Sequence, residues 1–172
     1  LKRSEAKTIV KSKSMVTEEI GLNEFLEKQG IHSVESDLGE FIVQLLGQKP
    51  YHIVTPAVHL RREDIAALFH ERFGTQPDAS AEELTLKARE LLREQFMTAD
   101  VGITGANFLL ADTGGIALTE NEGNARLTTT FPKIHIAIAG IEKIIPSWKD
   151  LNLFWPLLST HGTGQRLTAY NS

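Results

Sequence analysis

The chain has 172 residues, of which 41% are hydrophobic and 23% charged, a balance typical of a soluble globular protein with a single core. Its formal net charge of -4 provides no basic surface of the kind that binds nucleic acid, so we exclude that class of protein. The longest apolar runs are about six residues against the ~20 needed to cross a bilayer, and no secretory signal is visible, so we predict a cytoplasmic protein with no membrane span.

The first half of the chain alternates between strand and helix patterns. Strand patterns lie at Thr8–Val10, Ile31–Glu35 and Tyr51–Thr55. Helix patterns follow them, from Thr17 to a stop at Gly30, over Leu38–Leu46, and over Arg62–Phe73 before Gly74. Because a helix follows each strand, we predict an α/β fold, a mostly parallel sheet with flanking helices joined by right-handed crossovers.

The loop after the first strand is a candidate anion site. Lys11, Ser12 and Lys13 bring two ammonium groups and a hydroxyl close to the start of a helix, a composition suited to a negatively charged ligand. A solvated basic loop is the alternative, because Glu18 and Glu19 at the start of that helix weaken its attraction for an anion. We include the three residues among the predicted ligand-binding residues.

A long helix is predicted at Ala81–Met97, with Ser80 or Asp78 as its N-cap and its charged face in solvent. Strand patterns follow at Val101–Thr104, Phe108–Ala111, Gly115–Thr119 and Ile134–Ala139. The turn between the second and third of these is Asp112-Thr113-Gly114, whose residue types favour tight turns. We therefore predict a hairpin formed by Phe108–Ala111 and Gly115–Thr119, which lies in the sequence between the strands Val101–Thr104 and Ile134–Ala139.

The last part of the chain begins with a helix near Ser147 that carries Trp148 and Trp155. These two side chains either close the core or form a partner interface. A loop rich in Gly, Ser and Thr follows at Ser159–Gln165, before a possible last strand at Arg166–Tyr170. By analogy with open α/β folds, this loop could return to the same cleft as the other strand ends.

The stretch from Gly102 to Gly140 places polar residues at strand ends. Open α/β sheets bind ligands there, because backbone N–H groups and short polar side chains converge at that edge. A hairpin with a solvated acidic loop is the alternative explanation. The ligand-binding residues predicted in this stretch are Thr104, Gly105, Asn107, Thr113, Gly114, Asn121, Gly123, Asn124 and Arg126.

Familiar catalytic motifs are missing from the sequence. There is no G-x-G-x-x-G, no Walker loop, no H-E-x-x-H and no G-x-S-x-G. The six His residues have no metal-binding spacing, so we predict no metal site. His135 fits a hydrogen-bonded structural role better than proton transfer.

Glu120 and Glu122 are the candidate catalytic residues. They alternate along an extended segment, so their carboxylates could share a face and raise each other's pKa, while Arg126 lowers both. A carboxylate can act as a base or a nucleophile. An anion-binding role for Arg126 is the safer prediction, because a guanidinium binds carboxylate or phosphate through paired hydrogen bonds.

Four runs of sequence resemble the lactate-utilisation protein B family, the iron–sulfur subunits of a bacterial L-lactate oxidation system, whose central domain is called the LUD domain. The runs are VKSKSMVTEEIGLNEFL near the start, ADVGITGANF at 99–108, TENEGNARL at 119–127 and PKIHIAIAGIEKIIP at 132–146. The resemblance covers nearly the whole chain. It implies a fold similar to the NagB/RpiA/CoA-transferase group, and companion subunits in a lactate oxidation complex.

The resemblance also implies four-iron iron–sulfur clusters in the full-length protein. Such clusters are held by Cys thiolates, and this chain has no Cys, so we expect no cofactor in the chain itself. The chain begins at Leu1 and ends at Ser172 without a closing helix or cap. We therefore expect a single LUD-type domain, 1–172, excised from a longer protein.

Three functions are compatible with these observations. The first is a component of a system that oxidises L-lactate to pyruvate, in which this domain binds a small anionic ligand or partner subunits. The second is an autonomous enzyme of the CoA-transferase or sugar-phosphate isomerase kind that uses Glu120 or Glu122. The third is a non-catalytic assembly module.

Overall fold

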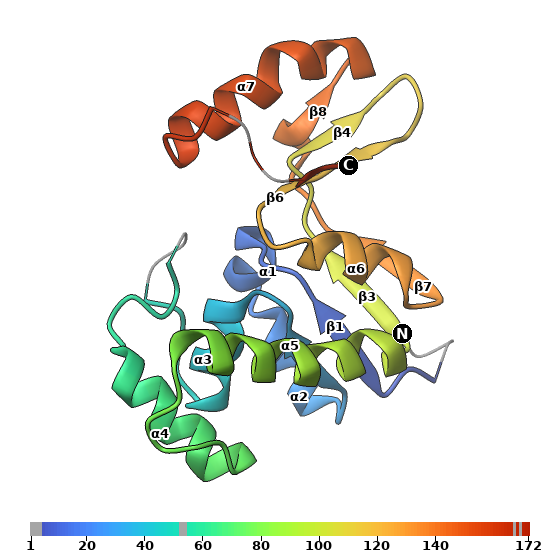
Figure 1. Cartoon of the computed structure of the whole chain (residues 1–172). Coiled ribbons are helices and arrows are strands. Elements are labelled where there is room, and N and C mark those ends of the chain that lie inside the picture. The colour runs from blue at the N-terminus through green and yellow to red at the C-terminus, as the bar shows by residue number, and fades with distance from the viewer. Residues whose placement is uncertain (1–4, 52–54, 167, 169) are drawn as a thin grey trace.

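The computed structural model describes residues 5–51, 55–166, 168 and 170–172. Within that part of the chain, the central sheet has four parallel strands in the order β2-β1-β3-β7. Figure 1 labels three of them, β1, β3 and β7. These strands are β1 (Thr8–Lys11), β2 (His32–Glu35), β3 (Val101–Thr104) and β7 (Ile134–Ala137). The predicted parallel α/β architecture is confirmed. Residues 52–54 of the strand predicted at Tyr51–Thr55 lie outside the described residues.

Helices cover both faces of the sheet. Neighbouring residues of a strand point to opposite faces, so the apolar side chains of β1 need a helix layer on each side. Val10 of β1 packs on one face with α3, α4 and α5, while Ile9 packs on the other face with Leu26 of α2. The helices are α1 (Met15–Glu19), α2 (Leu22–Lys28), α3 (Leu38–Leu45), α4 (Arg62–Phe73), α5 (Ala81–Thr98) and α6 (Asn124–Thr130). The sheet is therefore the middle of three layers.

Several helix ends follow the sequence signals. Ser80 caps α5 in a capping box with Glu83, as predicted for one of two candidate caps. Gly74, at φ +68°, ends α4 in the left-handed region. The single helix predicted from Thr17 is wrong, because Gly21 at φ +62° separates α1 from α2. A left-handed residue cannot continue a right-handed helix, so the chain turns there.

Backbone groups at the free edge of β2 form hydrogen bonds with a side chain. The amide of Gln44 accepts a hydrogen bond from the backbone N–H of Glu35 at 3.0 Å and donates to the carbonyl of Ser33 at 2.8 Å. One glutamine thus replaces one peptide unit of a neighbouring strand, which removes two open backbone groups from the edge.

Helix α6 lies close to the sheet because Gly102 has no side chain. A Cβ atom on Gly102 would lie 2.0 Å from the carbonyl oxygen of Thr128, which belongs to the backbone of α6. Only glycine permits this approach. The contact positions the start of α6, and with it the polar segment that precedes the helix, near the carboxyl ends of β1 and β3.

A smaller lobe is built from the parts of the chain after Thr104 other than α6 and β7, which belong to the central sheet and its helices (Figure 1). It contains β4 (Phe108–Leu110), β5 (Ile116–Ala117), β6 (Thr119–Glu120), β8 (Ile144–Ile145), β9 (Tyr170–Asn171), α7 (Leu151–Gly162) and short 3-10 turns at Ile141–Lys143 and Trp148–Asp150. The predicted hairpin is confirmed as the antiparallel pair β4–β5. The core of the smaller lobe consists of Ala117, Ile145 and Leu151, with Trp155 packed against them.

Two boundaries in this lobe differ from the sequence predictions. The loop predicted at Ser159–Gln165 is helical as far as Gly162, because α7 continues through Ser159 despite Pro156 inside the helix. The strand predicted at Arg166–Tyr170 includes residues 167 and 169, which lie outside the described residues. In the described part, β9 pairs antiparallel with β6 at Tyr170–Asn171.

Candidate functional site

The site begins where the strand order reverses. From β1 the chain goes on to β2 on one side, whereas from β3 it goes on to β7 on the other side. The loops that leave β1 and β3 therefore separate at the carboxyl edge of the sheet, just beyond the hydrogen bond from the Ser12 N–H to the Ile103 carbonyl at 2.9 Å. Open α/β sheets bind ligands at such a point.

A cleft of about 460 Å³ lies at this edge, between the sheet and the smaller lobe. It brings together eight of the residues predicted from sequence, namely Ser12, Lys13, Gly105, Asn107, Glu120, Asn121, Glu122 and Asn124. Gly105 lets two of the loops approach closely, because a Cβ atom there would lie only 3.0 Å from Ser14 Oγ. Residues far apart in the sequence thus form one polar surface.

Lys11 is not part of this surface. Its side chain is completely buried, and its Nζ contacts Glu35 Oε1 at 2.9 Å, Thr17 Oγ1 at 3.1 Å and Glu18 Oε1 at 3.3 Å. Burial lowers the pKa of Lys11, but the neighbouring carboxylates, Glu35 first, outweigh burial and raise it. The ammonium is therefore charged and has three partners, so the predicted anion contact from Lys11 has no donor left to make it.

Glu40 joins the same cluster from α3. Burial, followed by the charge of Glu35 and a hydrogen bond with it, raises the pKa of Glu40 to about 9. Glu40 is therefore the acid that holds a proton near neutral pH in the folded protein. Lys11, Glu35 and Glu40 therefore form a closed cluster that holds the ends of β1 and β2 against α1 and α3.

Glu120 is occupied by the backbone of α6. Its Oε2 accepts from the N–H of Ala125 at 2.6 Å and its Oε1 accepts from the N–H of Arg126 at 2.8 Å. Both carboxylate oxygens are used to cap the helix. The guanidinium of Arg126 is on an exposed residue that does not line the cleft. Arg126 thus contacts Glu120 through its backbone, and of the two catalytic candidates Glu122 is the one with an oxygen left to act.

Thr104, Thr113, Gly114 and Gly123 do not line the cleft either. Thr104 Oγ1 and His135 Nε2 are 2.8 Å apart, which gives His135 the hydrogen-bonded structural role, and burial lowers the pKa of this imidazole. Thr113 and Gly114 form the tip of the β4–β5 hairpin, with Gly114 at φ +69°. Gly123, at φ +76°, precedes α6.

Lys13 and Asp37 form a salt bridge at one wall of the cleft. Lys13 Nζ is 2.8 Å from Asp37 Oδ2, while Asp37 Oδ1 accepts from the N–H of Glu40 and caps α3. The ammonium of Lys13 is therefore held at the end of α3 by a carboxylate that is itself fixed. Lys13 remains on the surface of the cleft, unlike Lys11.

Glu122 faces the same salt bridge. Its Oε2 accepts from the N–H of Leu38 at 3.1 Å. Glu122 is exposed as a residue, but desolvation of its carboxyl group at the cleft wall, followed by the negative charge of Asp37, raises its pKa, and the Leu38 N–H and Lys13 oppose that rise. A carboxyl group with a raised pKa is able to give or take a proton closer to neutral pH than an ordinary glutamate.

Lys143 was missed by the sequence analysis, although it lines the cleft. It lies in the 3-10 turn Ile141–Lys143 that follows β7, and no hydrogen bond or ion pair of its ammonium is found among the described residues. A single lysine in a mixed segment carries no motif. Its position four residues after the apolar strand pattern that ends at Ala139 was the signal that could have identified it, because the carboxyl edge of the sheet begins there.

Asn107 and Asn121 are oriented by their neighbours. Asn107 Oδ1 accepts from the N–H of Thr119 at 2.8 Å, which leaves its amide NH2 group as a donor. Asn121 donates to Gln165 Oε1 at 3.1 Å. The segment after α7 thus returns to this cleft, as expected by analogy, and Thr163 lines it.

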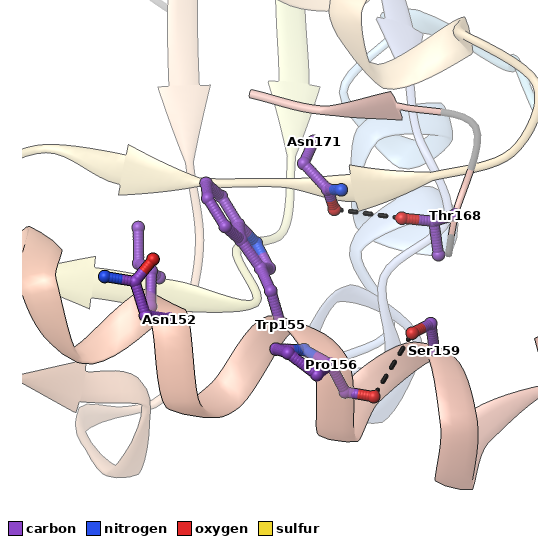
Figure 2. A pocket seen from close by; sticks show the side chains of 7 residues that line it. Asn152, Trp155, Pro156, Ser159, Thr168 and Asn171 are labelled. Carbon is purple, nitrogen blue, oxygen red and sulfur yellow. Dashed lines mark hydrogen bonds between the residues drawn. The ribbon is translucent and has the colours of Figure 1, made fainter. Parts of the chain in front are cut away.

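A second hollow, of about 190 Å³, lies between α7 and the end of the chain (Figure 2). Figure 2 shows Trp155 beside Asn171, whose Oδ1 accepts from Thr168 Oγ1 at 2.9 Å. The lining residues are Leu151, Asn152, Trp155, Pro156, Ser159, Thr168 and Asn171. Because none of them is charged, this hollow has no group that would attract an anion from water, and the larger cleft is the candidate site.

The described residues contain no group of three or more His, Cys, Asp or Glu side chains arranged to hold a metal ion. Every helix in the described ranges is too short or too polar to span a bilayer.

Comparison with known proteins places the chain among longer sequences. A family model described as LUD domain matches residues 3–172. Lactate utilization protein B of Oceanobacillus iheyensis is 51% identical over 170 residues, which cover 99% of this chain and 36% of that protein. Lactate utilization protein B of Bacillus subtilis is 49% identical over 171 residues, again 99% of this chain and 36% of the relative.

An uncharacterized electron transport protein of Escherichia coli is 47% identical over 170 residues, with the same shares of 99% and 36%. The chain thus spans only about a third of the length of these curated relatives. No solved structure matches it.

Proposed function

We propose, on the premise that this chain belongs to the LUD domain family, that it takes part in lactate utilisation by binding a small carboxylate in the cleft at the ends of β1 and β3. The carboxylate is lactate or the pyruvate formed from it. The domain acts in the cytoplasm, as one component of a lactate oxidation complex with companion subunits. Two relatives named for lactate utilisation and one named for electron transport support this assignment.

The observation that carries the proposal is that Lys143 and uncharged hydrogen-bond donors line the same cleft. Lys143 supplies a positive charge for which the described residues provide no counter-ion. The NH2 group of Asn107 and the hydroxyl of Ser12 line the same cleft and can donate to carboxylate oxygens. Charge-assisted hydrogen bonds to a carboxylate are the strong ones, so Lys143 is the main anchor.

Binding is tested by calorimetric titration with lactate, pyruvate and acetate. Replacing Lys143 by Ala should weaken lactate binding by about ten- to a hundredfold, since a hydrogen bond to a charged group is worth roughly 1.5–3 kcal/mol. Lys149→Ala is the matched control. It removes the same charge, but Lys149 is exposed and does not line the cleft. Equal loss in both variants, or no binding by the unaltered protein, would contradict the proposal and favour the assembly module.

Redox chemistry has to be supplied by groups outside this chain. Oxidation of a hydroxy acid to an oxo acid removes two electrons. The residues here do not fit an iron–sulfur cluster, because the chain has no Cys and clusters are held by thiolates. We propose that any four-iron clusters are bound by another part of a longer polypeptide or by a companion subunit. Iron and flavin analysis of the longer protein, purified with its partners, tests this.

A further inference from the structure

Glu122 differs from the two other carboxyl groups that line the cleft. Asp37 is engaged through both oxygens, by Lys13 and by the N–H of Glu40. Glu120 is engaged through both oxygens by the start of α6. Among the hydrogen bonds of the described residues, Glu122 uses only Oε2, toward Leu38. Its other oxygen is therefore the carboxyl atom in the cleft that remains available to a ligand.

The charges around Glu122 come from three segments. Asp37 and the Leu38 N–H face it from the loop between β2 and α3, Lys13 from the loop after β1, and Glu120 from β6. Desolvation of the carboxyl group and the charge of Asp37 raise the pKa of Glu122, and the Leu38 N–H and Lys13 lower it by less. A bound anion would add a further negative charge to these surroundings and so would favour the protonated carboxyl still more.

We propose that Glu122 carries the proton that accompanies the ligand, so that the cleft takes up a monocarboxylate and one proton together. This inference rests on the proposed function. The protonated carboxyl of Glu122 donates a hydrogen bond to one oxygen of the ligand, and Lys143 provides the positive charge. An ionised Glu122 would instead repel the ligand.

The same arrangement determines the class of ligand. Lys13 is balanced by Asp37, which leaves the charge of Lys143 and the proton of Glu122 for the incoming anion. This is enough to balance a single carboxylate. A dicarboxylate brings a second negative charge close to Asp37 and Glu120, at a point where the lining residues offer no further cation. The cleft should therefore prefer lactate, pyruvate or acetate to malonate or succinate.

The test measures proton uptake during binding. Lactate is titrated calorimetrically into the protein at several pH values, each in two buffers that differ in ionisation enthalpy. Where Glu122 is ionised in the free protein, the complex should gain up to one proton, and the affinity should fall by about tenfold per pH unit. Malonate should bind more weakly than lactate throughout.

Glu122→Gln separates a role for this proton from a role for the side chain. The glutamine keeps an oxygen for the Leu38 N–H and a permanent donor for the ligand, so this variant should bind lactate without proton uptake and with an affinity that does not change with pH. Glu19→Gln, at an exposed residue that does not line the cleft, should behave like the unaltered protein.

Thermal melts confirm that both variants fold. Binding without proton uptake in the unaltered protein, or uptake that persists in Glu122→Gln, overturns this inference alone. Absence of lactate binding at every pH overturns the proposed function and this inference with it.

Discussion

The ion cluster around Lys11 and the cleft beside it are built from the same residue types at the same edge of one sheet. In the cluster, the ammonium has three partners, and the buried Glu40 holds a proton. In the cleft, Lys143 and one oxygen of Glu122 have no partner among the described residues. Saturated ionic groups hold a fold together, whereas groups with an open atom are available to a ligand.

Strand geometry explains why Lys11 and Lys13 take different roles although they are two residues apart. Lys11 is the last residue of β1 and shares the face of Ile9, which points toward α2. Lys13 follows the end of the strand, where alternation no longer holds, and reaches Asp37 at the wall of the cleft. A basic sequence such as Lys11-Ser12-Lys13 therefore has one structural lysine and one cleft lysine.

The largest expected effect comes from opening the cluster. Lys11→Met keeps most of the side-chain volume but leaves Glu35 and Glu18 without their common cation. Breaking a buried pair by removing one partner costs about 3–5 kcal/mol, since an uncompensated charge remains. Urea denaturation at pH 7 should show this loss of unfolding free energy. A loss below about 1 kcal/mol would mean that the cluster is not a closed structural unit.

A second prediction concerns the proton held by Glu40. Its folded pKa of about 9 is above the ordinary value of 4.5. Between these values the folded state binds one proton more than the unfolded state, so this group makes stability fall as pH rises, by about 1.4 kcal/mol per unit. Glu40→Gln mimics the protonated acid and removes that fall. At pH 8 the variant should be more stable than the unaltered protein by up to about 5 kcal/mol.

The measurement is a series of denaturation curves from pH 5 to pH 9. Glu94→Gln, at an exposed position on α5, is the control for removal of a carboxylate and should follow the unaltered protein. Parallel pH profiles for Glu40→Gln and the unaltered protein would show that Glu40 is ionised in the folded state.

The sequence predicts most of the fold, but it does not predict which charged side chains pair in the cluster and which remain open in the cleft. Period and cap signals located β1, β2, β3, β7, α3, α4 and α5, because each element buries a regular stripe or alternation of apolar residues. The sequence does not report which neighbour a polar side chain meets. Lys11 was therefore expected in the anion site, and Lys143 was not expected there at all.

The short helix α6 shows the same limit at the level of local structure. Its sequence, NARLTTT, is rich in Thr, which has low helix propensity. The helix forms because Glu120 caps it and Gly102 lets it lie on the sheet. Both contacts join segments that are not adjacent in sequence, and they turned a predicted catalytic carboxylate into a cap.

The smallest effect on stability is expected for Lys13→Met, which makes the same change as Lys11→Met two residues away. The Lys13–Asp37 pair lies at the cleft surface, with the Lys13 side chain 29% exposed, and a solvated pair of this kind contributes about 1 kcal/mol or less.

The effect of Lys13→Met on ligand binding in the cleft should be clearer than its effect on stability. Lys13 lowers the pKa of Glu122, so its removal should move upward the pH at which lactate affinity declines. Denaturation curves and titrations across pH measure the two effects on the same protein. If Lys13→Met cost as much stability as Lys11→Met, and left the pH dependence of binding unchanged, Lys13 would belong to the closed cluster and not to the cleft.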